Sequence, residues 1–388
     1  MPVRISKPAF NLRSKLSELD VPIGSHGGQL MKSSSAEETF DLLGLSSGKR
    51  NVIVNGAMRF NQRGKSSYDS ADYTLDRWRY HRSTDGEFDI KPSTVAPPGF
   101  SNSLHVDCKV ASATVSSGAY ARLRYFIEGY DCQRFGKGTS KPKNFCLSFY
   151  AKSNCPGTYS VCLLDQTNST RVITRNYTIR DDEWHRYVIV FPNETAYPIA
   201  NSNATGIEIQ FGLTHGSNHN GGEGRDGWTA YAENKLHSGA SVNLYARTDN
   251  NWYLTGVQLE VGDVTTPFEH LSYGEDLARC QRYYQQIGPA SSSRYILTGG
   301  GNGTARIRGV HQLVTEMRVA PTVVHNTDSE SPTFYAYDGG PPSYTSVNSI
   351  SSTTQNFAWD FNTGTHNQQG SHFDIKGSGA FFTINAEM

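Results

Sequence analysis

Aromatic rings stand beside amide and carboxylate side chains near the C-terminal end of the chain. The apolar face of a sugar stacks on such rings, while its hydroxyl groups bond to Asn and Asp side chains. Asn356 and Asn362 supply amides in this region. The candidate receptor-binding residues are therefore Tyr335, Tyr337, Tyr344, Trp359, Asp360 and Phe361. Packing between copies of the chain is an equally good explanation for any one of these rings.

Three consecutive acidic residues in "RDDEW", Arg180 to Trp184, raise the possibility of glycan cleavage. A glycosidase needs two carboxyl groups about 5–10 Å apart across a cleft. Asp181 and Asp182 point in different directions, and the segment is typical of a turn. Asp85, Asp165 and Asp360 are conceivable partners in space, but sequence cannot show that pairing. We therefore assign no catalytic residues and expect no enzyme.

Two glycine-containing motifs mimic phosphate-binding loops. "GGEGRDG" contains G-x-G-x-x-G at Gly222, Gly224 and Gly227, but it lacks the preceding hydrophobic strand and the following helix of a dinucleotide site. "GKS" at Gly64 to Ser66 lacks the first glycine of a P-loop, because Arg59 occupies that place. Both segments are interpreted as loops, and no cofactor is expected.

The histidines and cysteines that could bind a metal do not have a convincing arrangement either. His215 and His219 have the spacing of a helical zinc pair, but Gly, Ser and Asn surround them, so we interpret them as residues of a surface loop. The six cysteines form no CxxC motif and are expected to be free thiols buried in strands. No metal is expected.

Composition limits the classes of protein that remain. The 388 residues carry zero net charge, which gives no electrostatic case for nucleic acid or for an anionic membrane. No apolar run suits a secretory signal or membrane insertion, so the expectation is a protein made in a cytoplasm. Abundant Gly, Ser, Thr, Asn and Tyr favour short strands joined by turns.

Period-two alternation dominates residues 51–271. In "ATGIEIQFGL", Ile207, Ile209, Phe211 and Leu213 alternate with polar residues or glycine, and similar runs recur between turns. Many short, half-buried strands predict a mainly β fold, an antiparallel jelly-roll sandwich. The rings expected in its core are Trp78, Phe145, Trp184 and Phe211.

Different patterns flank this domain. Residues 1–50 contain two amphipathic helical segments whose apolar sides carry Leu12, Leu16 and Leu19, and Phe40 and Leu43. Two such helices cannot bury a core alone, so we expect them to dock on another surface. Ser272 and Glu275 form a capping box that begins a linker helix over 272–288. Residues 289–388 return to strands, as a smaller β-sandwich head.

Several strings resemble segments of structural proteins from tailed bacteriophages. "NVIVNGAMRFNQRG" and "YTLDRWRYHR" resemble the opening of a common module, and "TPFEHLSYGEDLARCQRYYQ" resembles its close. "TEMRVAPTVV" and "FFTINAEM" are similar to a C-terminal domain attached to that module. "KPAFNLRSKLSELDVPIG" resembles virion-attachment segments of marine and cyanobacterial phage fibres.

The resemblance implies a homotrimeric tail fibre of the virion, with a central jelly roll like that of a carbohydrate-binding module. Its N-terminal arm, with the apolar residues named above, would attach to a tail, baseplate or adaptor protein. Its C-terminal head would bind host surface polysaccharide or lipopolysaccharide. Two alternatives stay open: a purely structural virion component, such as a head decoration or collar fibre, and a glycan-cleaving enzyme. The family brings no catalytic residues.

Overall fold

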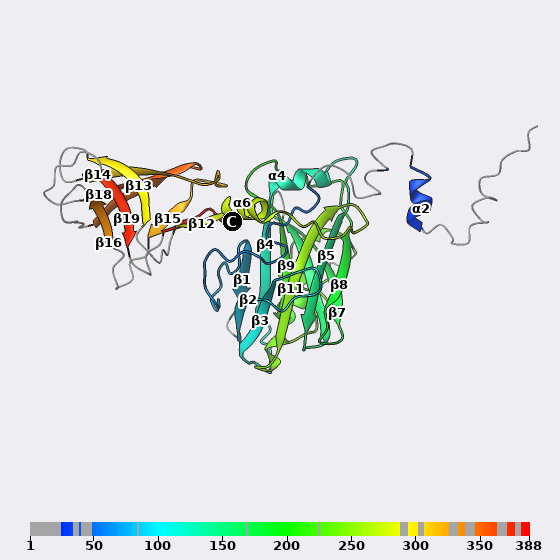
Figure 1. Ribbon diagram of the computed structural model, residues 1–388. Helices are drawn as coiled ribbons and strands as arrows, with labels where there is room; N and C mark the ends of the chain where they lie inside the picture. The colour runs from blue at the N-terminus through cyan, green and yellow to red at the C-terminus, as the bar shows by residue number, and fades with distance from the viewer. Residues whose placement is uncertain are drawn as a thin grey trace, which may run out of the picture.

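The fold is taken from a computed structural model of the chain (Figure 1). It describes residues 25–33, 39, 49–83, 85–167, 170–223, 226–287, 294–301, 306–325, 333–337, 346–362, 371–376 and 382–388.

Two antiparallel sheets form the central domain (Figure 1). In spatial order, the first contains β1 (Trp78–Arg82), β4 (Tyr120–Glu128), β9 (Thr205–His215), β6 (Gly157–Asp165), β7 (Arg171–Ile179) and β10 (Thr229–Ala230). The second contains β2 (Glu87–Ser93), β3 (Ser103–Val110), β11 (Asn251–Val261), β5 (Phe145–Ser153) and β8 (His185–Phe191). This arrangement confirms the predicted jelly-roll sandwich.

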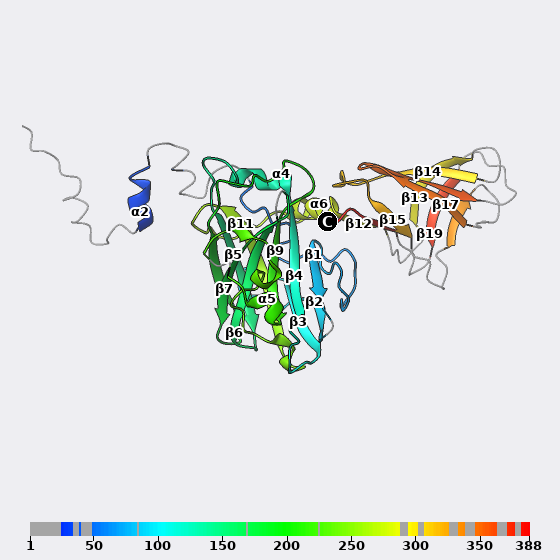
Figure 2. The same cartoon turned by 180° about the vertical axis from the view of Figure 1, so that it is seen from behind.

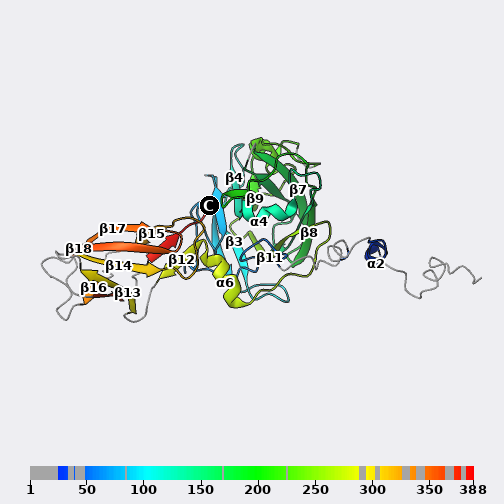
Figure 3. The same ribbon diagram turned by 90° about the horizontal axis from the view of Figure 1, so that it is seen from above.

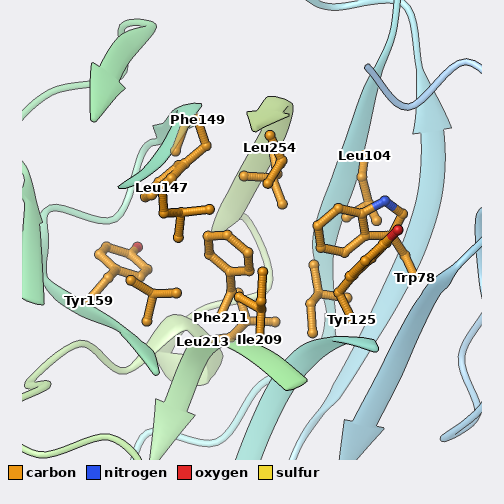
Figure 4. Close-up of a cluster of buried hydrophobic side chains, with 14 of the residues drawn as sticks. Trp78, Leu104, Tyr125, Leu147, Phe149, Tyr159, Ile209, Phe211, Leu213 and Leu254 are labelled. Carbon is orange, nitrogen blue, oxygen red and sulfur yellow. The ribbon is translucent and has the colours of Figure 1, made fainter. Parts of the chain in front are cut away.

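The inner faces of the two sheets form one hydrophobic core (Figure 4). Phe211 and Leu213 point from β9 toward Leu147 and Phe149 of β5, as the alternation requires. Trp78 packs against Tyr125 with ring centroids 4.9 Å apart. Phe145, Trp78 and Phe211 are fully buried, which confirms their predicted place in the core.

The helices in the described part of the chain are short and lie outside the sheets. They are α2 (Ser25–Leu30), α4 (Gly129–Cys132), α5 (Ser217–Asn220) and α6 (Tyr273–Gln281), with 3-10 turns η1 (Gln133–Phe135), η2 (Glu233–Lys235) and η3 (Leu244–Ala246). Helix α2 lies between the two predicted N-terminal helices. The anchoring residues Leu12, Leu16, Leu19, Phe40 and Leu43 lie outside the described residues.

Helix α6 begins as predicted but ends earlier. The Ser272 side chain accepts a hydrogen bond from the Glu275 amide at 3.3 Å. Beyond Gln281, however, β12 (Tyr284–Ile287) pairs with β20 (Phe382–Asn385) instead of continuing the helix. Backbone pairing with a distant strand, together with burial of Tyr284, outweighs the helical spacing of the segment.

Two further antiparallel sheets form the C-terminal part (Figure 3). One is β12, β20 and β15 (Thr322–His325). The other, in spatial order, is β16 (Thr333–Tyr337), β19 (Ser371–Lys376), β13 (Arg294–Gly301), β14 (Arg306–Gln312), β18 (Asn356–Asn362) and β17 (Ser346–Ser352).

A buried ionic network joins the C-terminal sheets to the sandwich. Arg77, between β1 and the preceding turn, donates hydrogen bonds to the Glu387 carboxylate and the Phe126 carbonyl. Its guanidinium carbon lies 3.4 Å from the ring centroid of Tyr283. Nearby, Glu128 accepts two hydrogen bonds of 2.8 Å from Arg282. The last residues of the chain are therefore held inside the junction between the two parts.

Candidate functional site

A row of polar and aromatic side chains crosses the outer face of the five-stranded sheet. Lys91 pairs with His105, His105 with Tyr253, and Tyr253 with Lys152, so residues of four adjacent strands lie side by side. Trp184 continues the row just before β8. Trp252 and Leu254, which flank Tyr253 in β11, face the core. Because side chains alternate along a strand, the residues of the row face outward. We call Lys91, His105, Tyr253, Lys152 and Trp184 the platform.

Three rings form the middle of the platform. His105 and Tyr253 stack with centroids 4.2 Å apart and planes only 3° apart. Trp184 stands edge-on to Tyr253, with centroids 6.1 Å apart and planes at 61°. The prediction that Trp184 belongs to the core is wrong, because this residue precedes the first residue of β8 and stays half-exposed on the outer face.

Charged groups flank the rings on both sides. Lys91 Nζ lies 2.6 Å from Asp107 Oδ2, and Lys152 Nζ lies 3.4 Å from Asp182 Oδ1. Burial lowers the pKa of His105, so its ring is neutral near pH 7. Its Nε2 is buried and has no hydrogen-bond partner among the described residues. The platform thus offers both donors and acceptors beside its rings.

A second aromatic group lies beside the platform, where Tyr150 stands two residues along β5 from Lys152. Phe100 packs against Tyr150 and Phe268, with centroid distances of 5.4 and 5.0 Å. Gly256, in the β11 bulge, has φ +61°, and an added Cβ would lie 2.7 Å from Phe100 Cζ. Glycine at this position therefore lets the Phe100 ring lie close against the β11 backbone.

The arrangement is suited to reversible binding of a sugar. Tyr253 and Trp184 supply ring surfaces for sugar C–H groups, and the paired Lys and Asp side chains supply partners for hydroxyl groups. A few placed polar groups around apolar rings are typical of ligand sites in proteins. The platform is therefore the candidate functional site of the sandwich.

Similarity to known proteins is found when structures are compared, but not when sequences are compared. No protein-family model matches the sequence, and no curated protein does so either. A family 11 carbohydrate-binding module from Clostridium thermocellum, in complex with a mixed-linked tetrasaccharide, is 10% identical, with a TM-score of 0.27 over 52% of this chain and 98% of that one. The N-terminal cellulose-binding domain of Cellulomonas fimi glucanase C is 13% identical, with a TM-score of 0.28 over 51% and 96%. A cyclase from Fischerella is 12% identical, with a TM-score of 0.31 over 56% and 100%.

The receptor-binding residues predicted from sequence lie elsewhere. Tyr335 and Tyr337 belong to β16, Trp359, Asp360 and Phe361 belong to β18, and Tyr344 lies outside the described residues. Three strands separate β16 from β18, so the two groups are about 19 Å apart across the sheet at the usual strand spacing. The backbone does not bring the two groups together, and their role stays a prediction.

Two of the acidic residues considered for catalysis, Asp181 and Asp165, are held in ion pairs. Asp181 lies in an exposed turn, where its Oδ1 is 2.6 Å from His185 Nε2. This hydrogen bond lowers the pKa of Asp181. Asp165 is buried and lies 2.6 Å from Lys137 Nζ. A general acid needs a raised pKa, so Asp181 does not have the required environment.

One group of carboxylates has the spacing of metal ligands. Oxygens of Asp69, Glu87 and Asp89 lie within 4.8 Å of one another among the described residues. Lys109 Nζ lies 3.0 Å from Asp69, 3.0 Å from Glu87 and 3.7 Å from Asp89. The ammonium group already compensates this charge, so the structure gives no support for a metal there.

His215 and His219 differ from their predicted surface position. His215 ends β9 and His219 belongs to α5, and both side chains are buried. The His215 ring stacks on His237 with centroids 3.6 Å apart and planes 8° apart. Gly212 makes this possible, because an added Cβ would lie 2.3 Å from His215 Nε2 and 2.6 Å from His237 Nδ1. The surface-loop interpretation is therefore wrong for these histidines.

The stacked pair should make the fold sensitive to acid. Burial lowers the pKa of His215 and of His237 well below the ordinary value of 6.5, and the effect is reinforced by Arg122 near His215 and by His215 next to His237. Below pH 6.5 the unfolded chain therefore gains protons that the folded chain does not, and stability falls. Each neutral histidine costs at most about 1.4 kcal/mol per pH unit. The melting temperature should drop by several degrees between pH 7.5 and 5.0.

Variants separate the acid sensitivity caused by the buried histidines from the opposite contribution of Asp76. Burial raises the pKa of Asp76 to about 6, so Asp76 favours the folded state as pH falls below 6. His215→Phe should reduce the acid-induced drop in melting temperature, whereas His270→Gln, at an exposed position, should leave it unchanged. Equal acid sensitivity in H215F and the wild type would contradict the assignment.

Among the helices of the described residues, none combines the length and the apolar character of a membrane-crossing helix.

Proposed function

We propose that this chain is a non-catalytic glycan-binding protein whose platform holds the sugar. The observation that carries the proposal is the register of four strands, which aligns Lys91, His105, Tyr253 and Lys152 in one outward row. Trp184 adds an indole at the end of the row. Rings with polar groups between them match the two kinds of surface that a sugar presents.

Binding fits these residues better than cleavage does. The carboxylates at the two ends of the platform, Asp107 and Asp182, are each paired with a lysine. A retaining or inverting glycosidase needs one protonated carboxyl group opposite a carboxylate. Ion-paired carboxylates instead hold their lysines in place and accept hydrogen bonds from hydroxyl groups.

In the organism, we propose that the chain acts as a tail-fibre adhesin on a phage virion. The support is the sequence resemblance of its N-terminal, central and C-terminal segments to phage structural proteins. A homotrimer attached by residues 1–50 would present several platforms at once, and such multivalency strengthens weak single sites. Val310, Val314 and Val324 of the C-terminal part expose 58%, 74% and 53% of their area, which contact between subunits would reduce.

Retardation in native gels tests the glycan proposal directly. The full chain is run through gels containing lipopolysaccharide, capsular polysaccharide or β-glucan, with bovine serum albumin as the unretarded reference. Retardation by at least one polysaccharide, without release of reducing ends, supports a binding protein. Free migration in every gel would favour the purely structural virion component, and new reducing ends would favour the enzyme.

A further inference from the structure

A second polar site lies on the opposite sheet, away from the platform. Figure 2 shows this sheet from behind, with α5 over its outer face. Arg122 of β4, Gly212 of β9 and Ser160 of β6 are paired across three adjacent strands. The segment that follows α5 crosses this face, and His237 from it lies 2.9 Å from Ser160 Oγ through Nδ1. Buried polar groups therefore gather between the sheet and its cover.

On this face, the positive charge of Arg122 is not compensated by an ion pair with any described residue, whereas the charges of Arg124 and Glu208 compensate each other. Glu208 accepts two hydrogen bonds from Arg124, one of them 2.9 Å long, and further bonds from Gln166 and Gln210. Arg124 thus neutralises Glu208. Arg122 is only 8% exposed, and no carboxylate lies within ion-pair distance of it among the described residues. A buried cation without a counter-ion is costly, so an anion bound here would be stabilising.

Buried nitrogen atoms that lack partners in the described part of the chain lie near this guanidinium. Arg122 Nε and Nη1 are buried and lack hydrogen-bond partners within the described chain. Nη2 lies 3.4 Å from His81 Nδ1, and the guanidinium carbon lies 4.4 Å from the Tyr120 ring centroid. Both ring nitrogens of His215 and Nε2 of His237 are also buried and have no hydrogen-bond partner among the residues that the structure describes. A forked guanidinium with imidazole groups nearby matches the several oxygens of an oxyanion.

We propose that Arg122 is the centre of an oxyanion-binding site, independent of the platform. The ligand is a carboxylate or phosphate group, such as an acidic substituent of a polysaccharide or a free anion. Besides Glu208, which is paired with Arg124, the acidic side chain nearby is Glu233, 59% exposed, whose Oε1 lies 3.6 Å from His219 Nδ1. Glu233 faces His219 and leaves the Arg122 donors uncompensated.

Thermal unfolding at pH 7.5 and constant ionic strength tests this site. Sodium phosphate or sodium glucuronate replaces sodium chloride. Either anion should raise the melting temperature of the wild type by about 2–4 °C, because a ligand of the folded state stabilises it. A rise in melting temperature with only one of the two anions shows whether the site prefers a phosphate or a carboxylate group. No rise with either anion would overturn the proposal and leave ordered water as the occupant.

Two variants separate this site from general salt effects. Arg122→Met should abolish the rise, while Arg175→Met, which removes an arginine from β7 of the same sheet, should retain it. An equal rise in R122M and the wild type would overturn the proposal. If R122M does not fold, Arg122→Lys replaces it: it keeps the charge but loses the forked donors, so the rise should shrink by at least half.

Discussion

Replacing Arg77 with Met should lower the free energy of unfolding by about 3–5 kcal/mol. The reason is that the Glu387 side chain is only 2% exposed and would lose its nearer guanidinium, which leaves Arg63 Nη2, 3.5 Å from Oε1, as its remaining ion-pair partner. Arg77 also contacts the Tyr283 ring and the Phe126 carbonyl, so the variant leaves a buried acceptor unpaired. Urea denaturation followed by tryptophan fluorescence measures the loss.

A double variant distinguishes the ion pair from simple loss of packing. Glu387→Gln removes the buried charge, so Arg77→Met combined with Glu387→Gln should be more stable than the sum of the two single effects predicts. Arg247→Met, at an exposed ion pair with Asp249, should change stability by less than about 1 kcal/mol. Strict additivity of R77M and E387Q would contradict a coupled pair at the junction.

Replacing Tyr253 with Ala should weaken glycan binding by about 10–100-fold, or roughly 1.4–2.8 kcal/mol. Tyr253 is the central ring of the platform, stacked on His105 and flanked by Trp184, so its loss removes apolar contact area and separates the other two rings. Titration calorimetry of the polysaccharide that retards the wild type gives the change in affinity.

The matched control is Tyr130→Ala, a variant of a tyrosine on α4 that is 54% exposed and lies outside the platform. Its affinity should equal that of the wild type. If Y253A binds normally while Tyr335→Ala or Trp359→Ala loses binding, the sugar is held by the C-terminal sheets, as the sequence first suggested.

Local patterns were enough to predict the sandwich. The alternation of Ile207, Ile209, Phe211 and Leu213 gives strand β9 and its buried face, because side chains of a strand point to opposite sides in turn. The Ser272 cap similarly gives the start of α6. The end of α6 was missed because β12 is defined by a partner about 100 residues later in the chain.

The platform depends on strand order and register, which local sequence patterns do not give. Alternation places His105 and Tyr253 on the outer faces of their strands, opposite neighbours that are buried. It gives no information about which strands are adjacent or how they are aligned, and both are needed to place His105 beside Tyr253. The burial of His215 was missed for a similar reason, since the ring that covers it belongs to His237, 22 residues later.

Fluorine NMR of the chain labelled with 5-fluorotryptophan tests the platform most directly. The chain contains five tryptophans, at positions 78, 184, 228, 252 and 359, so each resonance can be assigned from a single Trp→Phe variant. On addition of the polysaccharide that retards the protein, we predict that the Trp184 resonance shifts and that those of core residues Trp78 and Trp252 do not. A shift of Trp359 with Trp184 unmoved would contradict binding at the platform.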